Sequence, residues 1–277
     1  MPVGTVVAFH AHPDDEALLD AGTLARAAQA GHRVVLVLAT RGGAGDVGDG
    51  VLDQDEALGQ RRSVEAQASA DALGIARLAF LDYADSGHAP AEDGRWPAGT
   101  FCAAPIDEAA AALAQILTEE NAALLIADDD NGGDGHPDHV QVNRVARAAA
   151  QRTEVPLLLA TIDREFLSGG IELAKGMGFE VPEGFVPSDL STWYTPNAEI
   201  THTSDVSGVL DRRRASMAAH ATQTTGAPDS VRTLAVFLGL PEDIFAIAFS
   251  TEWFVLADHG TASLPDRLVD LFAPVVR

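Results

Sequence analysis

The chain has 277 residues, of which 47% are hydrophobic and 6% aromatic, and its 41 acidic and 18 basic side chains give a formal charge of −23. A chain of this length can form one large α/β domain with a substantial core. Its negative charge disfavours nucleic acid and anionic membranes as partners. Cys102 is the single cysteine, so an intrachain disulfide is excluded.

Short apolar runs alternate with helical patterns through the first 165 residues. The predicted strands are 5–9, 33–39, 78–81, 122–127 and 156–161, and the predicted helices are 16–30, 55–73, 105–119 and 140–151. Nearly continuous apolar strands separated by helices predict a mostly parallel sheet covered on both faces, the Rossmann-like, doubly wound α/β class. Ligands in such sheets bind outside the carboxyl ends of the strands.

The C-terminal part is less regular. We expect irregular structure near the site over residues 168–205, a helix over 211–221, late strands over 244–250 and 253–257, and a closing helix near 266–272. The chain is therefore predicted to be one domain, 1–277, with an α/β core over about 1–165 and a C-terminal elaboration over about 166–277.

The N-terminal apolar stretch is short and has no basic region before it, which indicates a strand and not a signal peptide. The longest apolar runs are far shorter than a membrane span. We therefore expect a cytoplasmic protein. The sequence leaves the oligomeric state open and is compatible with a homo-oligomer.

The first chemical motif, His12-Pro-Asp-Asp-Glu16, stands where the first strand ends and the first helix begins. Proline and acidic residues suit a first helical turn, because they need no free N–H there and interact well with the helix dipole. Capping accounts for one aspartate, but not for His12 or for two adjacent acids. His12 and Asp15 can meet through one turn, and together they provide two of the three protein ligands of a catalytic zinc.

A second motif, His136-Pro-Asp-His139, follows the fourth predicted strand, with Gly132, Gly133 and Gly135 just before it. Either histidine could complete a His₂Asp site with an open position for water. Histidines three residues apart are weak evidence alone. Two His-Pro-Asp segments, each at a strand-to-helix junction of one sheet, favour a metal site much more strongly.

Together these motifs resemble those of the PIG-L (LmbE-like) family of zinc N-deacetylases. Supporting matches are Arg62-Ser-Val-Glu65 followed by Leu73-Gly74, then Asp85-Ser-Gly87, and Ala219-His-Ala-Thr-Gln223. The matches extend to about residue 225. The resemblance implies a metal-dependent hydrolase that cleaves an N-acyl, especially N-acetyl, amide of a small amino sugar or glycoconjugate.

The resemblance also implies a role for each matching residue. His12, Asp15 and His139 would bind Zn²⁺, or Fe²⁺, which the same ligands can hold. Asp14 would be the general base that activates water, and His136 would stabilise the oxyanion, for which we expect an imidazolium. The positions of Arg62, Asp85 and His220 resemble substrate contacts. We expect Asp129 to orient a metal-binding histidine.

Other residues are predicted to be structural. His10 shares a strand face with His12, and we expect it to be held by hydrogen bonds. Glu16 is expected to cap or pair. The glycines at 42, 43 and 45 lack the spacing of a phosphate-binding loop and predict a flexible loop. No motif of the sequence includes the following residues, and we expect them to be structural: Cys102, His32, His88, His202 and His259.

Three alternatives stay open at this stage. One is an amidase of thiol (mycothiol-like) conjugates or a secondary-metabolite N-deacylase, because a fold and its motifs do not fix the substrate. Another is a catalytically silent metal- or sugar-binding module, against which stands Asp14, a residue that binding alone does not need. The third is a dinucleotide-dependent oxidoreductase, which would need a G-x-G-x-x-G where His12-Pro-Asp-Asp15 stands.

Overall fold

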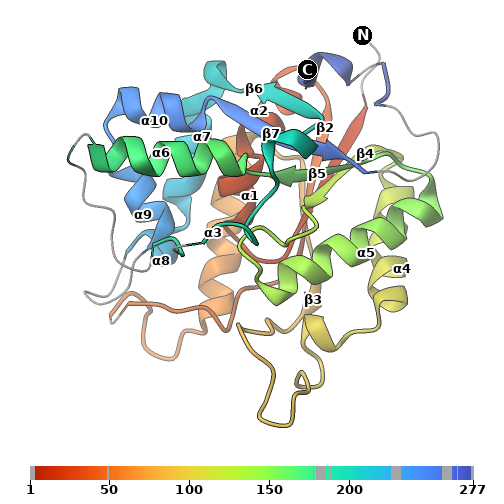
Figure 1. Cartoon of the computed structure of the whole chain (residues 1–277). Helices are drawn as coiled ribbons and strands as arrows, with labels where there is room; N and C mark the ends of the chain where they lie inside the picture. The colour runs from red at the N-terminus through yellow and green to blue at the C-terminus, as the bar shows by residue number, and fades with distance from the viewer. Residues whose placement is uncertain are drawn as a thin grey trace.

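The molecule is organised around one sheet (Figure 1). A computed structural model describes residues 4–48, 50–176, 178, 185–187, 189–225, 232–257, 264–266 and 268–275. Within them, eight strands pair in the order β3-β2-β1-β4-β5-β7-β6-β8. Their bounds are β1 Thr5–His10, β2 Arg33–Thr40, β3 Arg77–Tyr83, β4 Ala122–Asp128, β5 Leu157–Thr161, β6 His202–Asp205, β7 Thr251–Leu256 and β8 Ala273–Pro274. The first five are parallel and the last three pair antiparallel, which confirms the mostly parallel α/β class.

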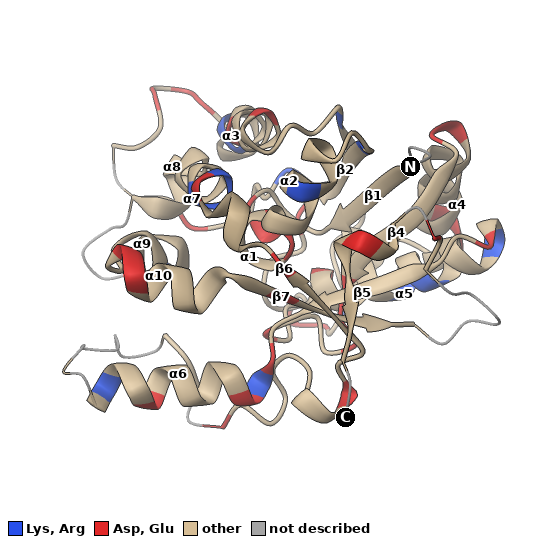
Figure 2. Ribbon diagram, turned by 90° about the horizontal axis from the view of Figure 1, so that it is seen from above, with Lys and Arg blue, Asp and Glu red and all other residues tan. Residues whose placement is uncertain are grey.

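Helices cover both faces of the sheet (Figure 2). Val6 and Ala8 of β1 pack with α2 (Ala21–Gln29) and α3 (Leu58–Leu73), and α7 (Leu210–Ala219) lies on these two helices. Val7 and Phe9 face the other way, toward α4 (Ile106–Glu119) and α5 (Pro137–Thr153). Alternate residues of a strand thus fill two separate cores.

The predicted helix over 16–30 is two helices, α1 (Asp15–Leu19) and α2, which meet at Asp20. The carboxylate of Glu252 in β7 accepts hydrogen bonds from Gly22 N and Thr23 N, at 2.8 and 2.7 Å. A carboxylate at these free amides supports a new helix start. The break therefore depends on a residue from the far end of the chain.

The C-terminal part differs most from its prediction. Residues 164–176, mostly expected to be irregular, form α6 (Arg164–Gly176). Residues 244–249, expected to be a strand, belong to α10 (Glu242–Phe249), which begins after Pro241 with two acidic residues in its first turn. A short apolar run does not distinguish a strand from a buried helix. The remaining elements are α8 (Ala221–Thr224), α9 (Thr233–Leu238) and four 3₁₀ turns: Phe101–Ala103, Asn197–Glu199, Ser207–Val209 and Val269–Leu271.

The predicted closing helix over 266–272 is replaced by the turn Val269–Leu271 and by β8, although residue 267 lies outside the described residues.

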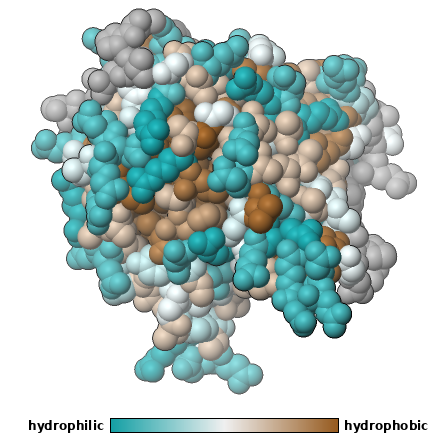
Figure 3. Space-filling model, turned by 180° about the vertical axis from the view of Figure 1, so that it is seen from behind, coloured by the Kyte–Doolittle hydropathy of each residue, from teal (hydrophilic) through white to brown (hydrophobic). Residues whose placement is uncertain are grey.

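On the face behind Figure 1, hydrophobic side chains gather near the centre and hydrophilic ones frame them (Figure 3). The edge strand β3 has mostly half-buried residues. Among the described residues, no helix has both the length and the apolar character needed to cross a membrane.

Candidate metal and catalytic site

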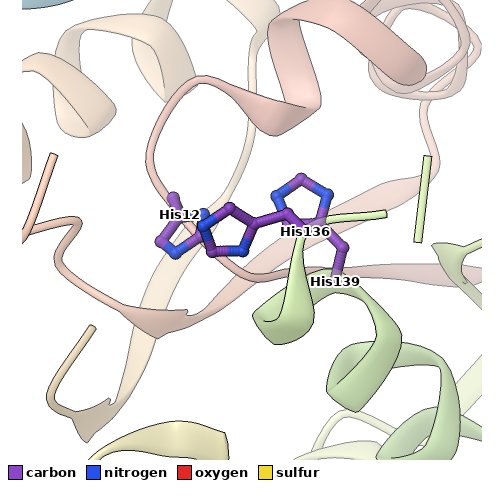
Figure 4. Close-up of side chains that lie close together, drawn as sticks. All are labelled: His12, His136 and His139. Carbon is purple, nitrogen blue, oxygen red and sulfur yellow. The ribbon is translucent and has the colours of Figure 1, made fainter. Parts of the chain in front are cut away.

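The two His-Pro-Asp motifs meet at one edge of the sheet. β1 and β4 are parallel neighbours, and the chain leaves β1 for β2 on one side and reaches β4 on the other. Such a switch of direction opens a crevice at the carboxyl ends of the strands. His12 follows β1, and His136 and His139 begin α5, so their rings gather at this crevice (Figure 4). A cavity of ≈ 300 Å³ opens over them.

Asp15 lies between the two histidines that were predicted to share a metal with it. Its Oδ2 is 3.7 Å from His12 Nδ1, and its Oδ1 is 3.4 Å from His139 Nε2. The ring centroids of His12 and His139 are 5.4 Å apart. Asp15 Oδ2 also accepts a 2.7 Å hydrogen bond from His12 N, which fixes the turn that joins them.

The donor atoms around this point suit a divalent cation. Three groups of side chains each bring one nitrogen or oxygen per residue within 4.8 Å of one another: His12, His136 and His139; Asp15, Asp128 and His139; and His12, Asp85 and Asp138. Asp128 Oδ2 is buried without a hydrogen-bond partner. Imidazole and carboxylate ligands are those that zinc and ferrous iron take, so the residues present fit such an ion.

Two carboxylates hold the His12 ring. Its Nε2 is 3.2 Å from Asp138 Oδ2 and 3.4 Å from Asp85 Oδ1. Burial lowers the pKa of His12, but these hydrogen bonds outweigh it and raise the pKa to about 10. Asp138 also accepts hydrogen bonds from Ser86 N at 2.9 Å and Cys102 Sγ at 3.0 Å. Asp138 had been given no role from the sequence, although it stands inside the second motif.

Asp14 is the N-cap residue of α1 and has a strained backbone conformation. Its φ is 104°, a left-handed conformation that is rare for residues other than glycine. Arg62 Nη2 donates a 2.9 Å hydrogen bond to Asp14 Oδ1. The backbone N–H of Asp14 donates to Glu16 Oε2 at 3.1 Å. Burial raises the pKa of the Asp14 carboxyl, and Arg62 opposes that rise. The carboxylate lines the cavity and is 22% exposed, so it can reach a molecule bound there.

Arg62 is held by the glycine-rich loop after β2. Its Nη1 donates to Gly42 O at 2.9 Å. A Cβ added at Gly42 would lie 2.3 Å from Arg62 Nη1, and one at Gly45 would lie 2.8 Å from it. The glycines therefore leave room for a guanidinium. Arg62 lines the cavity but is only 4% exposed, because its Nη2 also donates to Pro13 O and Asp14 Oδ1.

His136 is the N-cap of α5. Its Nδ1 accepts a hydrogen bond from Asp138 N at 3.2 Å, so the neutral ring carries its proton on Nε2. Burial and the neighbouring His12 and His139 lower its pKa to about 3. Burial and the neighbouring histidines therefore favour the neutral imidazole over the expected imidazolium, and a neutral ring can still donate one hydrogen bond.

Asp128, and not Asp129, contacts a predicted metal ligand. Asp128 Oδ2 is 3.3 Å from His139 Nδ1, and its Oδ1 is 2.7 Å from the buried His10. Asp129 instead accepts hydrogen bonds from Gly133 N at 2.8 Å and from the hydroxyl of Thr161 at 2.5 Å. Asp129 therefore shapes the loop before α5. The contact with a histidine that was expected of Asp129 is made by Asp128.

His220 is corrected as well. It is fully buried beneath α1 and does not appear among the described residues that line the cavity. Its Nε2 is 2.7 Å from Glu16 Oε1, and Glu16 also binds Ser69 Oγ and Asp14 N. Glu16 pairs, as predicted. His220 therefore supports the turn that carries Asp14, and a contact with substrate is not supported. Asp85, in contrast, does line the cavity.

Replacing Glu16 with glutamine should destabilise the fold in a pH-dependent manner. Burial opposes the ionised carboxylate, but His220 and Ser69 lower its pKa from 4.5 to about 2. A lowered pKa stabilises the fold above pH 4.5, and that contribution is lost as the pH falls toward 2. We expect Glu16→Gln to lower the free energy of unfolding by about 3 kcal/mol at pH 7 and by much less at pH 3.

Urea unfolding at both pH values measures this difference. Glu172→Gln is the control, because Glu172 is an exposed partner of Lys175 and such pairs contribute little. Equal losses for the two variants at pH 7 would contradict the buried pair.

Two further residues at the site carry no recognisable sequence signal. The ring centroid of His88 is 4.7 Å from that of His136, and His88 lines the cavity, although it was expected to be structural. Cys102, also expected to be structural, donates a hydrogen bond to Asp138. Both lie in the loop region that follows β3, whose path could not be predicted. His10 is held by Asp20 and Asp128, as expected, and His259 lies outside the described residues.

Known structures share this fold. A teicoplanin deacetylase in a zinc-inhibited form is 19% identical, with a TM-score of 0.57 over 92% of this chain and 99% of that chain. A 4-carboxy-2-hydroxymuconate hydratase from Pseudomonas putida is 13% identical, with a TM-score of 0.56 over 95% and 100%. At such identities the similarity shows the fold alone. The two proteins are named for different reactions, a deacetylation and a hydration.

Sequence relatives are more specific. A 1D-myo-inositol 2-acetamido-2-deoxy-alpha-D-glucopyranoside deacetylase from Streptomyces avermitilis is 34% identical over 99% of this chain and 98% of its own length. The family model of PIG-L, described as GlcNAc-PI de-N-acetylase, matches residues 7–150 and so includes both His-Pro-Asp motifs. The resemblance found in the motifs is confirmed, and the chain belongs to the PIG-L family.

Proposed function

We propose that this protein is a metal-dependent hydrolase that removes the acyl group from an N-acylated amino sugar. The observation that carries the proposal is the meeting of His12, Asp15 and His139 beside Asp14, a cavity-lining carboxylate with a raised pKa. A binding module needs no such base. Its relative from Streptomyces avermitilis is named as a deacetylase of an acetamido sugar, which supports the same reaction class.

The metal would be held by His12, Asp15 and His139, with Zn²⁺ the first candidate and Fe²⁺ the second. Two imidazoles and one carboxylate are a common ligand set for a catalytic zinc. When bound, such an ion polarises the amide carbonyl and lowers the pKa of water. Asp85 and Asp138 then serve to hold the His12 ring in place, as hydrogen-bonding carboxylates do around many metal sites.

The remaining steps belong to side chains of this chain. The Asp14 carboxylate accepts a proton from the attacking water, and its raised pKa makes it a stronger base at neutral pH. His136 donates its Nε2 proton in a hydrogen bond to the oxyanion of the tetrahedral intermediate. When the C–N bond breaks, Asp14 returns the proton to the amine, because the neutral His136 is a poor acid. The products are a carboxylate and a free amine.

The sugar would lie at the polar end of the cavity. We assign to that end Arg62, Asp85, His88 and Gln223, polar residues that line the cavity and offer hydrogen bonds to hydroxyl groups.

We also propose that residues 1–277 act as one domain, since β6, β7 and β8 of the C-terminal part continue the sheet of the core.

Asp128→Asn should weaken metal binding without removing a ligand. Asp128 contacts His139 Nδ1 from the side away from Asp15, and its loss should lower the metal affinity by about 10–100-fold. Competition with a chromogenic chelator measures that affinity. Asp129→Asn is the matched control, and we expect its metal affinity to stay within about threefold of wild type. A larger loss in Asp129→Asn than in Asp128→Asn would reverse the assignment.

The proposed function is tested by incubating the purified protein with N-acetylglucosaminyl inositol and measuring acetate and free amine. We expect both products in equal amounts, loss of both after chelation, and recovery on addition of Zn²⁺. An amide of a thiol conjugate of the same sugar, tested beside it, distinguishes the amidase alternative. Undiminished release after complete removal of metal would contradict the mechanism.

A further inference from the structure

A second, apolar cavity adjoins the candidate site. It measures ≈ 410 Å³ and lies between α6 on one side and α9 and α10 on the other, where the helices run beside each other in Figure 2. We call it the α6 groove. Its side chains are almost all aliphatic or aromatic, and they include Phe166, Leu173, Val236, Ile244 and Ile247. A cavity of this size and character suits an apolar ligand.

The α6 groove adjoins the cavity over the histidines. The residues that line both are Leu18, Leu19, Ile162, Leu167, Phe185 and Phe237. Leu18 and Leu19 belong to α1, the helix that begins at Asp15. The apolar wall that the two cavities share therefore lies within one helical turn of Asp15, a predicted metal ligand.

The groove is not an ordinary part of the core. None of the 13 residues of α6 is buried, although Phe166, Leu167 and Ile171 line the groove. Phe166, Leu173 and Ile247 are 40%, 59% and 62% exposed. Exposed apolar side chains gathered at one opening mark a binding surface more often than chance. They are notable in a chain with a net charge of −23.

Among the described residues that line the groove, Arg213 and Glu252 carry charge, and they pair with each other. Arg213 Nη1 is 3.0 Å from Glu252 Oε1, and both side chains are buried. Arg213 also donates to the carbonyl of Phe249, and Glu252 accepts from Gly22 N and Thr23 N. Arg213 Nε is buried without a hydrogen-bond partner, but Glu252 balances the charge of the guanidinium, so the described lining favours an apolar ligand.

We propose that the α6 groove binds a long aliphatic N-acyl chain of the substrate, so that the enzyme is a deacylase of long-chain N-acyl amino sugars. This inference rests on the proposed function. If the sugar occupies the polar end of the first cavity, its amide nitrogen faces that end and its acyl carbon faces the opposite one. We place the acyl carbon toward Leu18 and Leu19, which line both cavities, so that the acyl chain extends past them into the groove.

The test compares methyl glycosides of N-acetyl-, N-butanoyl- and N-octanoylglucosamine, at concentrations where each is monomeric. The octyl glycoside of N-acetylglucosamine carries the same chain on the other side of the sugar. Release of amine gives kcat/KM for each. Because burial of a methylene favours binding by roughly threefold to fourfold, we expect octanoyl to exceed acetyl by at least about tenfold.

Variants that place a large side chain in the groove can be compared with a neighbouring variant that leaves the groove open. A Cβ at Gly170, which lines the groove, or at Gly169, which does not, meets nothing within 4 Å, so a side chain fits on the helix at both positions. Gly170→Phe should lower the octanoyl-to-acetyl ratio of kcat/KM by about tenfold, whereas Gly169→Phe should leave it unchanged. Ala174→Phe, one turn along α6, is a second blocking variant, and thermal unfolding shows whether each variant folds.

Each outcome separates the explanations. A falling ratio in Gly170→Phe and Ala174→Phe, with no gain for the octyl glycoside, supports the proposal. A gain for the octyl glycoside alone would assign the groove to the aglycone and overturn it. Equal rates for all acyl lengths, or a change of oligomeric state in Gly170→Phe without a change in the ratio, would also overturn it while leaving the deacetylase intact. No release from any substrate would refute the proposed function itself.

Discussion

Asp14→Asn is expected to retain its metal and to lose about 10²–10⁴-fold in kcat, the range that general base catalysis contributes. Asparagine is the suitable replacement because Asp14 has a φ of 104°, a conformation that asparagine tolerates well. It also keeps an acceptor for Arg62, which donates to Asp14 Oδ1. The variant therefore removes the base while preserving the turn. Steady-state kinetics and elemental analysis of the same sample measure both effects.

Two controls accompany this variant. Asp15→Asn should lose metal as well as activity, because Asp15 lies between His12 and His139. Asp82→Asn neutralises an exposed carboxylate paired with Arg41 and should change neither. If Asp14→Asn were as active as the wild-type protein, another group would be the base. If it lost its metal, Asp14 would be a ligand.

His139→Ala is expected to lower the metal affinity by more than about 100-fold, since loss of an outer hydrogen-bonding partner alone costs 10–100-fold. His139 is the proposed ligand from α5, so its loss would leave only the two proposed ligands of the turn after β1. Activity should fall with metal content and recover in part at high Zn²⁺ concentration. Elemental analysis after gel filtration, with activity measured over a range of added Zn²⁺, follows both quantities.

His202→Ala serves as the matched control. His202 lies in β6 and is bonded to Thr201, away from the cavity. It should retain the metal content of the wild-type protein. Equal metal content in His139→Ala and wild type would remove His139 from the ligand set and leave the assignment of the site to other groups.

The part of the site that the sequence predicted lies in two local segments. His12 and Asp15 are three residues apart, and His136 and His139 are too, so each pair is positioned by one turn of chain. The α/β pattern then required only that β1 and β4 be neighbours for the two segments to meet. Short-range geometry and a regular fold class were enough for this much.

The supporting residues could not be predicted in the same way. Asp128 follows the predicted strand over 122–127 and proves to be the last residue of β4, and its contact with His139 depends on the path of the loop before α5. His220 reads as a substrate contact, but it lies beneath α1 against Glu16, 204 residues away in the chain. Such contacts depend on how the layers pack, which local sequence patterns do not encode.

The C-terminal helices illustrate a further limit. The sequence Phe-Ala-Ile-Ala-Phe within α10 has strand-like composition, and its helical state follows from a Pro-Glu-Asp start and from packing of Phe245 and Phe249 on α7 and α9. α6 was unexpected because glycine residues interrupt its pattern and it buries none of its side chains. Both helices border the α6 groove, so the proposed preference for long acyl chains would depend on the part of the fold that was hardest to predict.

We propose that a metal held by His12, Asp15 and His139 is required for hydrolysis of an N-acyl amide. The most direct test removes all metal from the purified protein, adds Zn²⁺ in known steps, and measures acetate release from N-acetylglucosaminyl inositol at each step. We predict no release without metal and a rise that ends at about one ion per chain, with no rise in His139→Ala at the same concentrations. Full activity in the metal-free protein, or the same titration curve for His139→Ala, would contradict the account.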